Sequence, residues 1–203
     1  MKIICIGRNY VEHAKELNNA IPGEPVFFMK PDTAILPVGR AFYLPDFSKD
    51  IHHEIELVLK ISKEGKKISE EFAHRYFDQI SVGIDFTARD IQQKQKEKGL
   101  PWEPAKAFDH SAPCGEFISF KELKDPENIQ FHLNINGKTV QMGNCNLMIF
   151  NFAKVISYVS QFITLRKGDL IYTGTPSGVG AVKENDLLEC FLEGKKMLEV
   201  KVL

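Results

Sequence analysis

The sequence predicts an α+β fold with much antiparallel sheet, and three observations support that prediction. Helical patterns gather in the first half of the chain, whereas strand patterns dominate the second half. The pair Asn136-Gly137 stands between two alternating stretches, which is a strong signal for a β-hairpin. Within residues 51–62, apolar residues alternate with polar ones, as in a strand that buries one face.

The first half is expected to combine strands with short polar helices. Ser69 fits an N-cap, and Thr87-Ala88-Arg89-Asp90 fits a capping box at the start of a charged helix. Gly99-Leu100-Pro101 should end that helix, and 21–25 should break the first one. The expected elements are strands at 1–7, 51–62 and 80–85, helices at 10–19, 69–77 and 87–97, a short apolar run at 26–29 and a turn at 64–66.

The second half is expected to be rich in strands, with a single helix at 152–162. The hairpin signal at Asn136-Gly137 should pair the strands on either side of it. The expected strands are 115–119, 129–135, 138–141, 169–173, 187–192 and 196–202.

Length and charge narrow the class of protein. A chain of 203 residues with 43% hydrophobic residues suits one domain with a sizeable core, spanning 1–203. The net charge of -1 gives no electrostatic reason to expect nucleic acid or a membrane surface as partner. No apolar run reaches the roughly 18 residues of a spanning helix, and the opening apolar stretch is too short for a signal peptide.

The cysteines indicate a reducing compartment. Cys5, Cys114, Cys145 and Cys190 are widely scattered and show no paired spacing. That pattern argues against a zinc knuckle and against a disulfide framework. A cytoplasmic protein is therefore expected.

Two glutamates in the stretch 51–62 are the most informative residues of the chain. On a strand, Glu54 and Glu56 share one face, opposite the apolar side chains, so two carboxylates are held side by side. Like charges this close raise each other's pKa unless a cation lies between them. Asp85 could supply a third oxygen ligand, and an oxygen-only set favours Mg²⁺, Mn²⁺ or Ca²⁺. The alternative is that the two glutamates lie on a solvated strand face and that Asp85 is unrelated to them. His52 shares the face of the glutamates and could support their carboxylates. His53 falls on the apolar face.

Other side chains are suggestive without being decisive. Arg89 and Gln92 share a helix face that could bind an anion, but an exposed charged helix shows the same pattern. Lys106 lies among apolar residues, where a buried lysine needs an anion, although most such lysines extend their charged ends into solvent.

Two further motifs could be either functional or merely structural. The glycine-rich stretch 173–180, which contains Thr175, is either a ligand-binding loop or a wide turn, and it is not a P-loop. His13 and Glu16 are spaced i, i+3, so a glutamate could orient an imidazole that accepts a proton from water. The pair could equally stand on an exposed polar helix.

Taken in order, these motifs resemble the fumarylacetoacetate hydrolase superfamily, in particular its short acylpyruvase and oxaloacetate decarboxylase branch. The resemblance runs nearly end to end. The matching pieces are Gly7-Arg8-Asn9-Tyr10, His13-Ala14-Lys15-Glu16, Lys30-Pro31, His53-Glu54-Ile55-Glu56-Leu57, Asp85-Phe86-Thr87-Ala88-Arg89-Asp90, Lys98-Gly99-Leu100-Pro101-Trp102, Ala105-Lys106, Phe108-Asp109 and Thr173-Gly174-Thr175-Pro176-Ser177-Gly178-Val179-Gly180.

The resemblance implies a fumarylacetoacetase-type mixed β-sandwich roll with flanking helices, usually a homodimer. It implies Mg²⁺ or Mn²⁺, with Ca²⁺ as a substitute in crystals, and a small 2-oxo acid as substrate. It also implies that residues 8–25 form a mobile lid. The implied roles are metal ligation by Glu54, Glu56 and Asp85, substrate contact by Arg89, Gln92 and Thr175, and catalysis by His13, Glu16 and Lys106.

The chain departs from the family pattern in two places. Val140 and Met142 replace a more usual arginine and acidic residue in the predicted hairpin, and Asn144-Cys145-Asn146 replaces a threonine-containing stretch. These changes lie near the expected site or dimer contact. They leave the substrate open without touching the expected metal ligands.

The resemblance favours hydrolysis of a 3-acylpyruvate to pyruvate and a carboxylic acid, with an enolate stabilised by the metal and Lys106. His13 and Glu16 favour this reaction because hydrolysis needs an activated water. Oxaloacetate decarboxylation or tautomerisation, and isomerisation or decarboxylation of a 2-hydroxymuconate-type dienol, could use the same site. A further alternative is a non-catalytic protein in which the metal stabilises a 2-oxo acid binding site.

Overall fold

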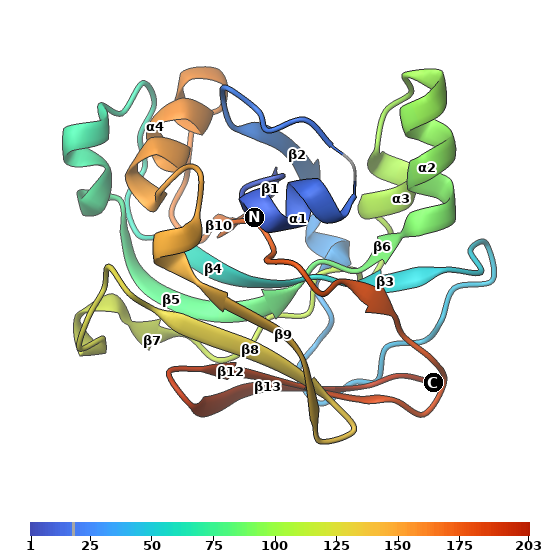
Figure 1. Ribbon diagram of the computed structural model, residues 1–203. Helices are drawn as coiled ribbons and strands as arrows, with labels where there is room; N and C mark the ends of the chain where they lie inside the picture. The colour runs from blue at the N-terminus through green and yellow to red at the C-terminus, as the bar shows by residue number, and fades with distance from the viewer. Residues whose placement is uncertain (18) are drawn as a thin grey trace.

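The computed structural model describes residues 1–17 and 19–203, and its largest unit is a six-stranded sheet in the order β2-β1-β10-β4-β5-β7 (Figure 1). Neighbouring strands of this sheet run antiparallel except β1 and β10, which are parallel. The strands are β1 (Ile3–Gly7), β2 (Val26–Lys30), β4 (Ile55–Ile61), β5 (Phe77–Ile84), β7 (Ile118–Ser119) and β10 (Leu170–Tyr172).

Two smaller sheets complete the β structure. The predicted hairpin at Asn136-Gly137 is confirmed, since β8 and β9 pair on either side of it within a four-stranded sheet of order β13-β12-β8-β9. A three-stranded sheet has the order β11-β3-β6. The strands are β3 (Ile51–His53), β6 (Thr87–Ala88), β8 (Gln130–Ile135), β9 (Lys138–Asn144), β11 (Gly180–Ala181), β12 (Leu187–Leu192) and β13 (Lys195–Lys201).

The core lies between the six-stranded and four-stranded sheets. Leu57 and Leu59 of β4 are fully buried in one apolar cluster with Leu133 of β8 and Cys190 of β12. The alternation read from the sequence explains this layer, because every second residue of β4 points to the same side. Burial of such side chains contributes roughly 1.5–3 kcal/mol each.

The helices cover the upper side of the six-stranded sheet in Figure 1. Helix α4 lies over one end of that sheet, and α2 and α3 lie together at the other end beside β6 and β3 (Figure 1). The helices are α1 (Val11–Glu16), α2 (Arg89–Lys98), α3 (Glu103–Lys106) and α4 (Phe152–Phe162), with 3₁₀ turns at Asp32–Ala34, Glu70–Arg75, Phe120–Glu122 and Cys145–Leu147.

The predicted strand at 51–62 is divided at Glu54. On one side of it His53 pairs with Gly180 in the three-stranded sheet, and on the other Ile55 pairs with Ile84 in the large sheet. The carbonyl oxygen of Glu54 accepts a hydrogen bond of 2.8 Å from the Asp85 amide. The chain therefore passes from one sheet to another at a residue that belongs to the expected site.

Several local predictions need correction. Thr87 does not cap α2, because it lies in β6, and Ala88 precedes the helix without a side-chain cap. The stretch expected as a helix at 69–77 is a 3₁₀ turn, in which Ser69 makes no capping bond. Strands also run through the first half, so helices and strands are less segregated than the sequence indicated. The helix expected at 10–19 and the lid expected at 8–25 both include Asn18, which lies outside the described residues.

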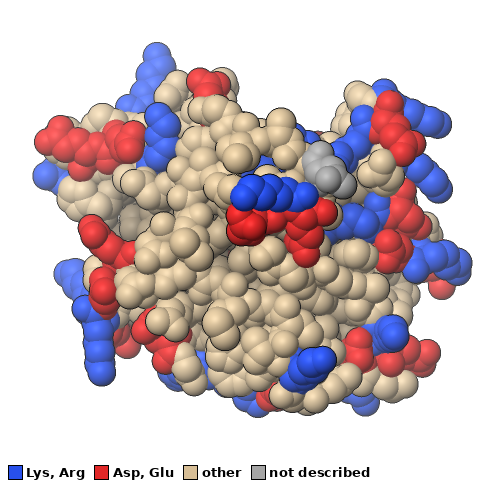
Figure 2. All heavy atoms as spheres, viewed as in Figure 1, with Lys and Arg blue, Asp and Glu red and all other residues tan. Residues whose placement is uncertain are grey.

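Figure 2 shows charged side chains around the rim of the face it presents and in one mixed group near its middle, over α1, with few over the area of β8 and β9. Basic and acidic side chains alternate around this rim rather than forming a large area of one sign. No helix among the described residues is long and apolar enough to cross a membrane.

Asn9 ties three distant parts of the chain together directly after β1. Its buried amide donates to the carbonyl oxygens of Phe150 (2.9 Å) and Thr173 (2.8 Å) and accepts from the Phe150 amide at 2.7 Å. These bonds link the segment before α1 to the start of α4 and to the glycine-rich loop after β10. The position of that loop therefore depends on Asn9.

We predict that Asn9→Ala lowers the free energy of unfolding by about 2–4 kcal/mol, because three buried backbone groups lose their partner. Urea unfolding followed by circular dichroism measures this difference. Asn146→Ala is the matched control, since among the described residues its exposed side-chain amide bonds only to Asn128, and we expect a change within about 0.5 kcal/mol. Equal effects of the two substitutions would contradict the assigned role of Asn9.

Candidate active site

Three carboxylates meet where the large sheet approaches the three-stranded sheet. Glu54 stands between β3 and β4, Glu56 lies within β4, and Asp85 follows β5 directly. One carboxylate oxygen of each lies within 4.8 Å of the others, and all three residues are buried. The structure thus brings together the three acidic residues that the sequence singled out.

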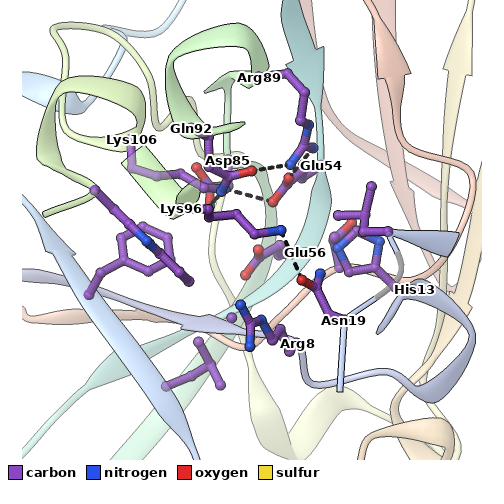
Figure 3. Close-up of a pocket in the computed structure, with 16 residues that line it drawn as sticks. Arg8, His13, Asn19, Glu54, Glu56, Asp85, Arg89, Gln92, Lys96 and Lys106 are labelled. Atoms are coloured by element: carbon purple, nitrogen blue, oxygen red, sulfur yellow. Dashed lines mark hydrogen bonds and ion pairs between the residues drawn. The ribbon is translucent and has the colours of Figure 1, made fainter. Parts of the chain in front are cut away.

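Two cations are held against these carboxylates from α2 and α3. The Lys106 ammonium donates to Glu54 Oε2 (2.8 Å) and Asp85 Oδ2 (2.7 Å), and Arg89 Nη2 donates to Glu54 Oε1 at 2.5 Å. Lys106 also donates to the Thr87 hydroxyl at 2.5 Å, so the threonine predicted to cap a helix instead fixes the lysine. Figure 3 shows Lys106 and Arg89 approaching Glu54 and Asp85 from separate directions.

A third cation, Lys30 at the end of β2, lies beside Asp85 and was not given a role from the sequence. Its side chain is fully buried, and Nζ lies 2.8 Å from Asp85 Oδ1. Nζ also donates to Ser111 Oγ (2.8 Å) and to the carbonyl oxygens of Phe86 and Lys106. The last bond connects Lys30 to the backbone of the lysine that faces the pocket. The Lys30-Pro31 motif had marked this residue, but sequence alone could not show that its charge is turned inward.

The buried charges shift one another's pKa values in opposite directions. Burial alone would raise the pKa of Glu54, but the attraction of Lys106 and Arg89 outweighs it and lowers that pKa. Burial, followed by repulsion from Asp85 and Glu54, raises the pKa of Glu56 well above its usual range. Burial would lower the pKa of Lys106, yet Asp85 and Glu54 raise it, so this lysine stays charged.

Glu56 is the carboxylate of the three that forms no ion pair with Lys30, Lys106 or Arg89. It accepts a hydrogen bond of 2.7 Å from the Gly174 amide, but no ion pair to it is found in the described part of the chain. A buried carboxylate without a counter-charge is strongly unfavourable. A hard divalent cation bound by Glu54, Glu56 and Asp85 would supply that charge through oxygen ligands alone. The residues present therefore fit a divalent metal.

The predicted substrate-contacting residues lie around the same pocket. Arg89 Nη1 donates to Gln92 Oε1 at 2.6 Å, so one turn of α2 presents a joined cation and amide. The Thr175 hydroxyl accepts from Gln141 Nε2 at 2.9 Å. All three predicted residues line the pocket.

Gln141 of β9 is a positioning residue that the sequence did not reveal. Its Oε1 accepts from His53 Nδ1 (2.8 Å) and from the Ile55 amide (3.1 Å), while Nε2 donates to Thr175. The glutamine therefore joins β4 to the glycine-rich loop. It stands between Val140 and Met142, the two residues that depart from the family pattern, and Met142 itself is exposed.

His13 and Glu16 meet as their spacing predicted. His13 Nδ1 lies 3.2 Å from Glu16 Oε2, and His13 is buried and lines the pocket. The other carboxylate oxygen of Glu16 accepts from the Gly178 amide at 3.0 Å. Glu16 does not line the pocket itself. Its carboxylate contacts the His13 imidazole and joins α1 to the glycine-rich loop.

One sequence-based interpretation is wrong. His52, which could have supported the glutamates, instead places Nε2 2.9 Å from Asp50 Oδ1, because β3 pairs in the three-stranded sheet and is not continuous with β4 of the large sheet. His53 is buried as expected for the apolar face. Residues that sequence reasoning missed at the pocket also include Arg8, Asn19, Lys96 and Trp102.

Comparison with known proteins finds one family over almost the whole chain. The family described as Fumarylacetoacetate (FAA) hydrolase C-terminal matches residues 2–203. The chain is 42% identical over 200 residues to Oxaloacetate tautomerase FAHD1, mitochondrial, of Bos taurus, covering 98% of this chain and 90% of the relative. It is 39% identical over 197 residues to Oxaloacetate tautomerase YcgM of Escherichia coli (strain K12), covering 97% of this chain and 90% of the relative.

Solved structures share the same fold. The crystal structure of fumarylpyruvate hydrolase from Pseudomonas aeruginosa, in complex with Mn²⁺ and pyruvate, superposes with a TM-score of 0.94 and 38% identity. That match covers 100% of this chain and 89% of the other. The mixed β-sandwich with flanking helices expected from the sequence is thereby confirmed.

We predict that Glu56→Gln raises the melting temperature of the metal-free protein at neutral pH by about 2–4 °C, which corresponds to about 1 kcal/mol in a chain of this size. The amide removes the repulsion of Glu56 by Asp85 and Glu54 while its oxygen keeps the bond from Gly174. Differential scanning fluorimetry in chelator measures the effect. Glu97→Gln, on the exposed side of α2, should leave the temperature unchanged. A lower melting temperature for Glu56→Gln would show that its charge is stabilising.

Proposed function

The chain belongs to the fumarylacetoacetate hydrolase family, and from that premise we propose that it is a divalent-metal-dependent enzyme that interconverts the keto and enol forms of oxaloacetate. Two of its similar relatives carry the name oxaloacetate tautomerase, which supports this choice of reaction. The observation that carries the proposal is the set of three buried carboxylates facing Lys106, Arg89 and His13 in one pocket.

In this proposal Glu54, Glu56 and Asp85 hold Mg²⁺ or Mn²⁺. The metal, when bound, would supply positive charge that favours an enolate oxygen over the uncharged keto oxygen of the substrate. The donor set supports a hard ion, and a similar solved structure is described as a complex with Mn²⁺ and pyruvate.

The protein side chains around the metal site then bind and orient the 2-oxo acid. Lys106 stays charged, so its ammonium can donate to oxygens on which negative charge develops. Arg89, held by Gln92, and the Thr175 hydroxyl add donors on other sides of the pocket. Both Arg89 and Lys106 must share their hydrogen bonds between the carboxylates and the substrate.

His13 is assigned the proton transfer. Keto–enol conversion moves a proton from C3 of oxaloacetate to the oxygen on C2. The Glu16 carboxylate occupies Nδ1 of His13, which leaves Nε2 to accept the C3 proton and pass it to the oxygen on C2. Among the described residues that line the pocket, His13 is the only imidazole.

Hydrolysis of a 3-acylpyruvate is the second candidate, and it is the reaction that the sequence analysis favoured. The His13–Glu16 pair supports it, because the same imidazole could take a proton from a water that attacks the distal carbonyl. Cleavage of the C–C bond would give pyruvate and a carboxylic acid. Oxaloacetate decarboxylation and isomerisation of a muconate-type dienol would use the same stabilised enolate without water attack.

Other expectations stay predictions. They are the homodimer, the cytoplasmic location, the single catalytic domain over 1–203 and a lid formed by 8–25. Sedimentation of the purified protein tests the first, and limited proteolysis with and without oxalate tests the last. The assay below also tests the alternative of a non-catalytic 2-oxo acid binding protein.

The direct test uses protein stripped with chelator and reloaded with Mg²⁺ or Mn²⁺. Ultraviolet absorbance follows the enol of oxaloacetate, and a lactate dehydrogenase couple follows pyruvate released from acetylpyruvate and fumarylpyruvate. Metal-dependent acceleration of enol decay supports the first candidate. Pyruvate release from acylpyruvates without enol conversion would replace it with the second, and no turnover of any substrate would leave a binding protein.

We predict that His13→Asn lowers kcat for enol conversion by about 10²–10⁴-fold, the usual contribution of a general base, with little change in Mn²⁺ affinity. Stopped-flow absorbance and isothermal titration calorimetry measure the two quantities. His74→Asn is the control, because His74 lies on the 3₁₀ turn Glu70–Arg75, away from this pocket. Unchanged kcat would remove His13 from the reaction.

We further predict that Lys106→Met lowers kcat/KM for every substrate by at least about 10²-fold, since it removes a donor aimed at developing charge. Loss of this cation leaves Glu54 and Asp85 less compensated, so Mn²⁺ should raise the melting temperature of the variant more than that of the wild type. Lys98→Met, at the exposed end of α2, should behave as wild type in both measurements.

A further inference from the structure

The pocket has a second group of cations that the proposed reaction does not use. Arg8 and Lys96 line it together with Asn19 and Trp102, on the side of the pocket formed by the segment after β1 and by α2. Figure 3 shows the Lys96 ammonium directed toward Asn19, with Arg8 on the same side of the pocket. These residues come from separate elements and meet only in the folded chain.

Lys96 continues the helix face that already carries the substrate-contacting residues. Arg89, Gln92 and Lys96 are spaced i, i+3, i+7, so they lie on one face of α2, and all three line the pocket. Arg89 is neutralised by Glu54, whereas the only hydrogen-bond partner of the Lys96 ammonium among the described residues is the neutral Asn19 Oδ1, at 2.9 Å. Burial, followed by repulsion from Arg8 and Arg89, lowers the pKa of Lys96.

Arg8 is held in an unusual backbone conformation. Its φ is 59°, in the left-handed region that costs a non-glycine residue roughly 1–2 kcal/mol. The bonds of the neighbouring Asn9 to Phe150 and Thr173 fix the chain at this point. The guanidinium lies over the Trp102 ring, 5.8 Å from its centroid. A strained residue that is held this firmly and turned to a pocket indicates a binding role.

Neither cation has an anionic partner in the described part of the chain. The ion pairs of that part engage Lys30, Lys106 and Arg89 at the carboxylates, but neither Arg8 nor Lys96. Two cations close enough to repel each other are favourable only when an anion joins them. The chemistry that fits a planar guanidinium beside an ammonium is a carboxylate.

We propose that Arg8 and Lys96 form a subsite for the second carboxylate of the substrate, so that the enzyme selects 2-oxo dicarboxylates over 2-oxo monocarboxylates. The inference rests on the proposed function only in placing the 2-oxo acid end near Lys106 and the metal ligands. Oxaloacetate has anionic groups at both ends, and each end then meets its own cations. A 2-oxo acid with an uncharged far end leaves Arg8 and Lys96 unpaired.

The test measures binding rather than turnover, with two ligands of equal chain length. Isothermal titration calorimetry of the Mn²⁺-loaded protein compares 2-oxoglutarate with 2-oxopentanoate, which carries a methyl group in place of the second carboxylate. We expect the wild type to prefer 2-oxoglutarate by at least about tenfold, the scale of one charge-assisted contact. Lys96→Met and Arg8→Asn should each remove most of that preference; asparagine tolerates the positive φ of position 8.

Three controls distinguish a specific carboxylate subsite from a general electrostatic attraction of the protein for anions. Lys98→Met removes an equal charge from the exposed side of α2 and should keep the preference. Lys96→Arg should also keep it, because the charge remains. Oxalate, which has no distal group, should bind all variants within about twofold of the wild type, and if Arg8→Asn fails to fold, the two substitutions at Lys96 decide the question.

The outcomes distinguish this inference from the proposed function. A preference that survives Lys96→Met, or an equal loss of affinity for oxalate, would overturn the subsite. A preference lost in Lys96→Met and kept in Lys98→Met supports it, whether or not the wild type converts the enol of oxaloacetate. Absence of enol conversion with that same binding pattern would contradict only the assigned reaction.

Discussion

The structure depends on the balance of charge around three buried carboxylates. Glu54, Glu56 and Asp85 lie close together and away from solvent, where unpaired charges are very unfavourable. Lys30, Lys106 and Arg89 supply cations against Glu54 and Asp85, but not against Glu56. The formal charges of the three carboxylates and the three cations cancel, but none of these cations pairs with Glu56, and the carboxylate oxygens together suit a dication. A divalent ion bound there would give this group of charges a positive surplus, which favours an anionic substrate.

The fold holds this arrangement by joining segments that are far apart in sequence. The chain changes sheets at Glu54, which places its carboxylate beside Glu56 of β4 and Asp85 at the end of β5. Gln141 joins β4 to the glycine-rich loop, and Asn9 joins that loop to the start of α4. These are neutral side chains, yet they fix the distances among the charged ones. Their hydrogen bonds are buried, so a loosened contact leaves backbone groups unsatisfied.

Part of this architecture could be predicted from sequence and part could not. The alternation around Glu54 and Glu56, the hairpin at Asn136-Gly137 and helix α4 follow from local patterns. The motifs also led to the right fold and to the residues that meet in the pocket. The prediction that Thr87 caps a helix was wrong because a capping pattern considers only neighbouring residues. In the structure the Thr87 hydroxyl instead accepts a hydrogen bond from Lys106, 19 residues away. Lys30 and Gln141 carry no local signal for their contacts, and Arg8 and Lys96 carry none for their position at the pocket, since the fold alone brings their neighbours close.

The central claim is that one divalent cation binds among Glu54, Glu56 and Asp85. Anomalous diffraction from a crystal soaked in Mn²⁺ tests it most directly. We expect one strong anomalous peak per chain, bordered by an oxygen of each of these three carboxylates. No peak at this position, or a peak held by other residues, would contradict the account of the site and of the reaction built on it.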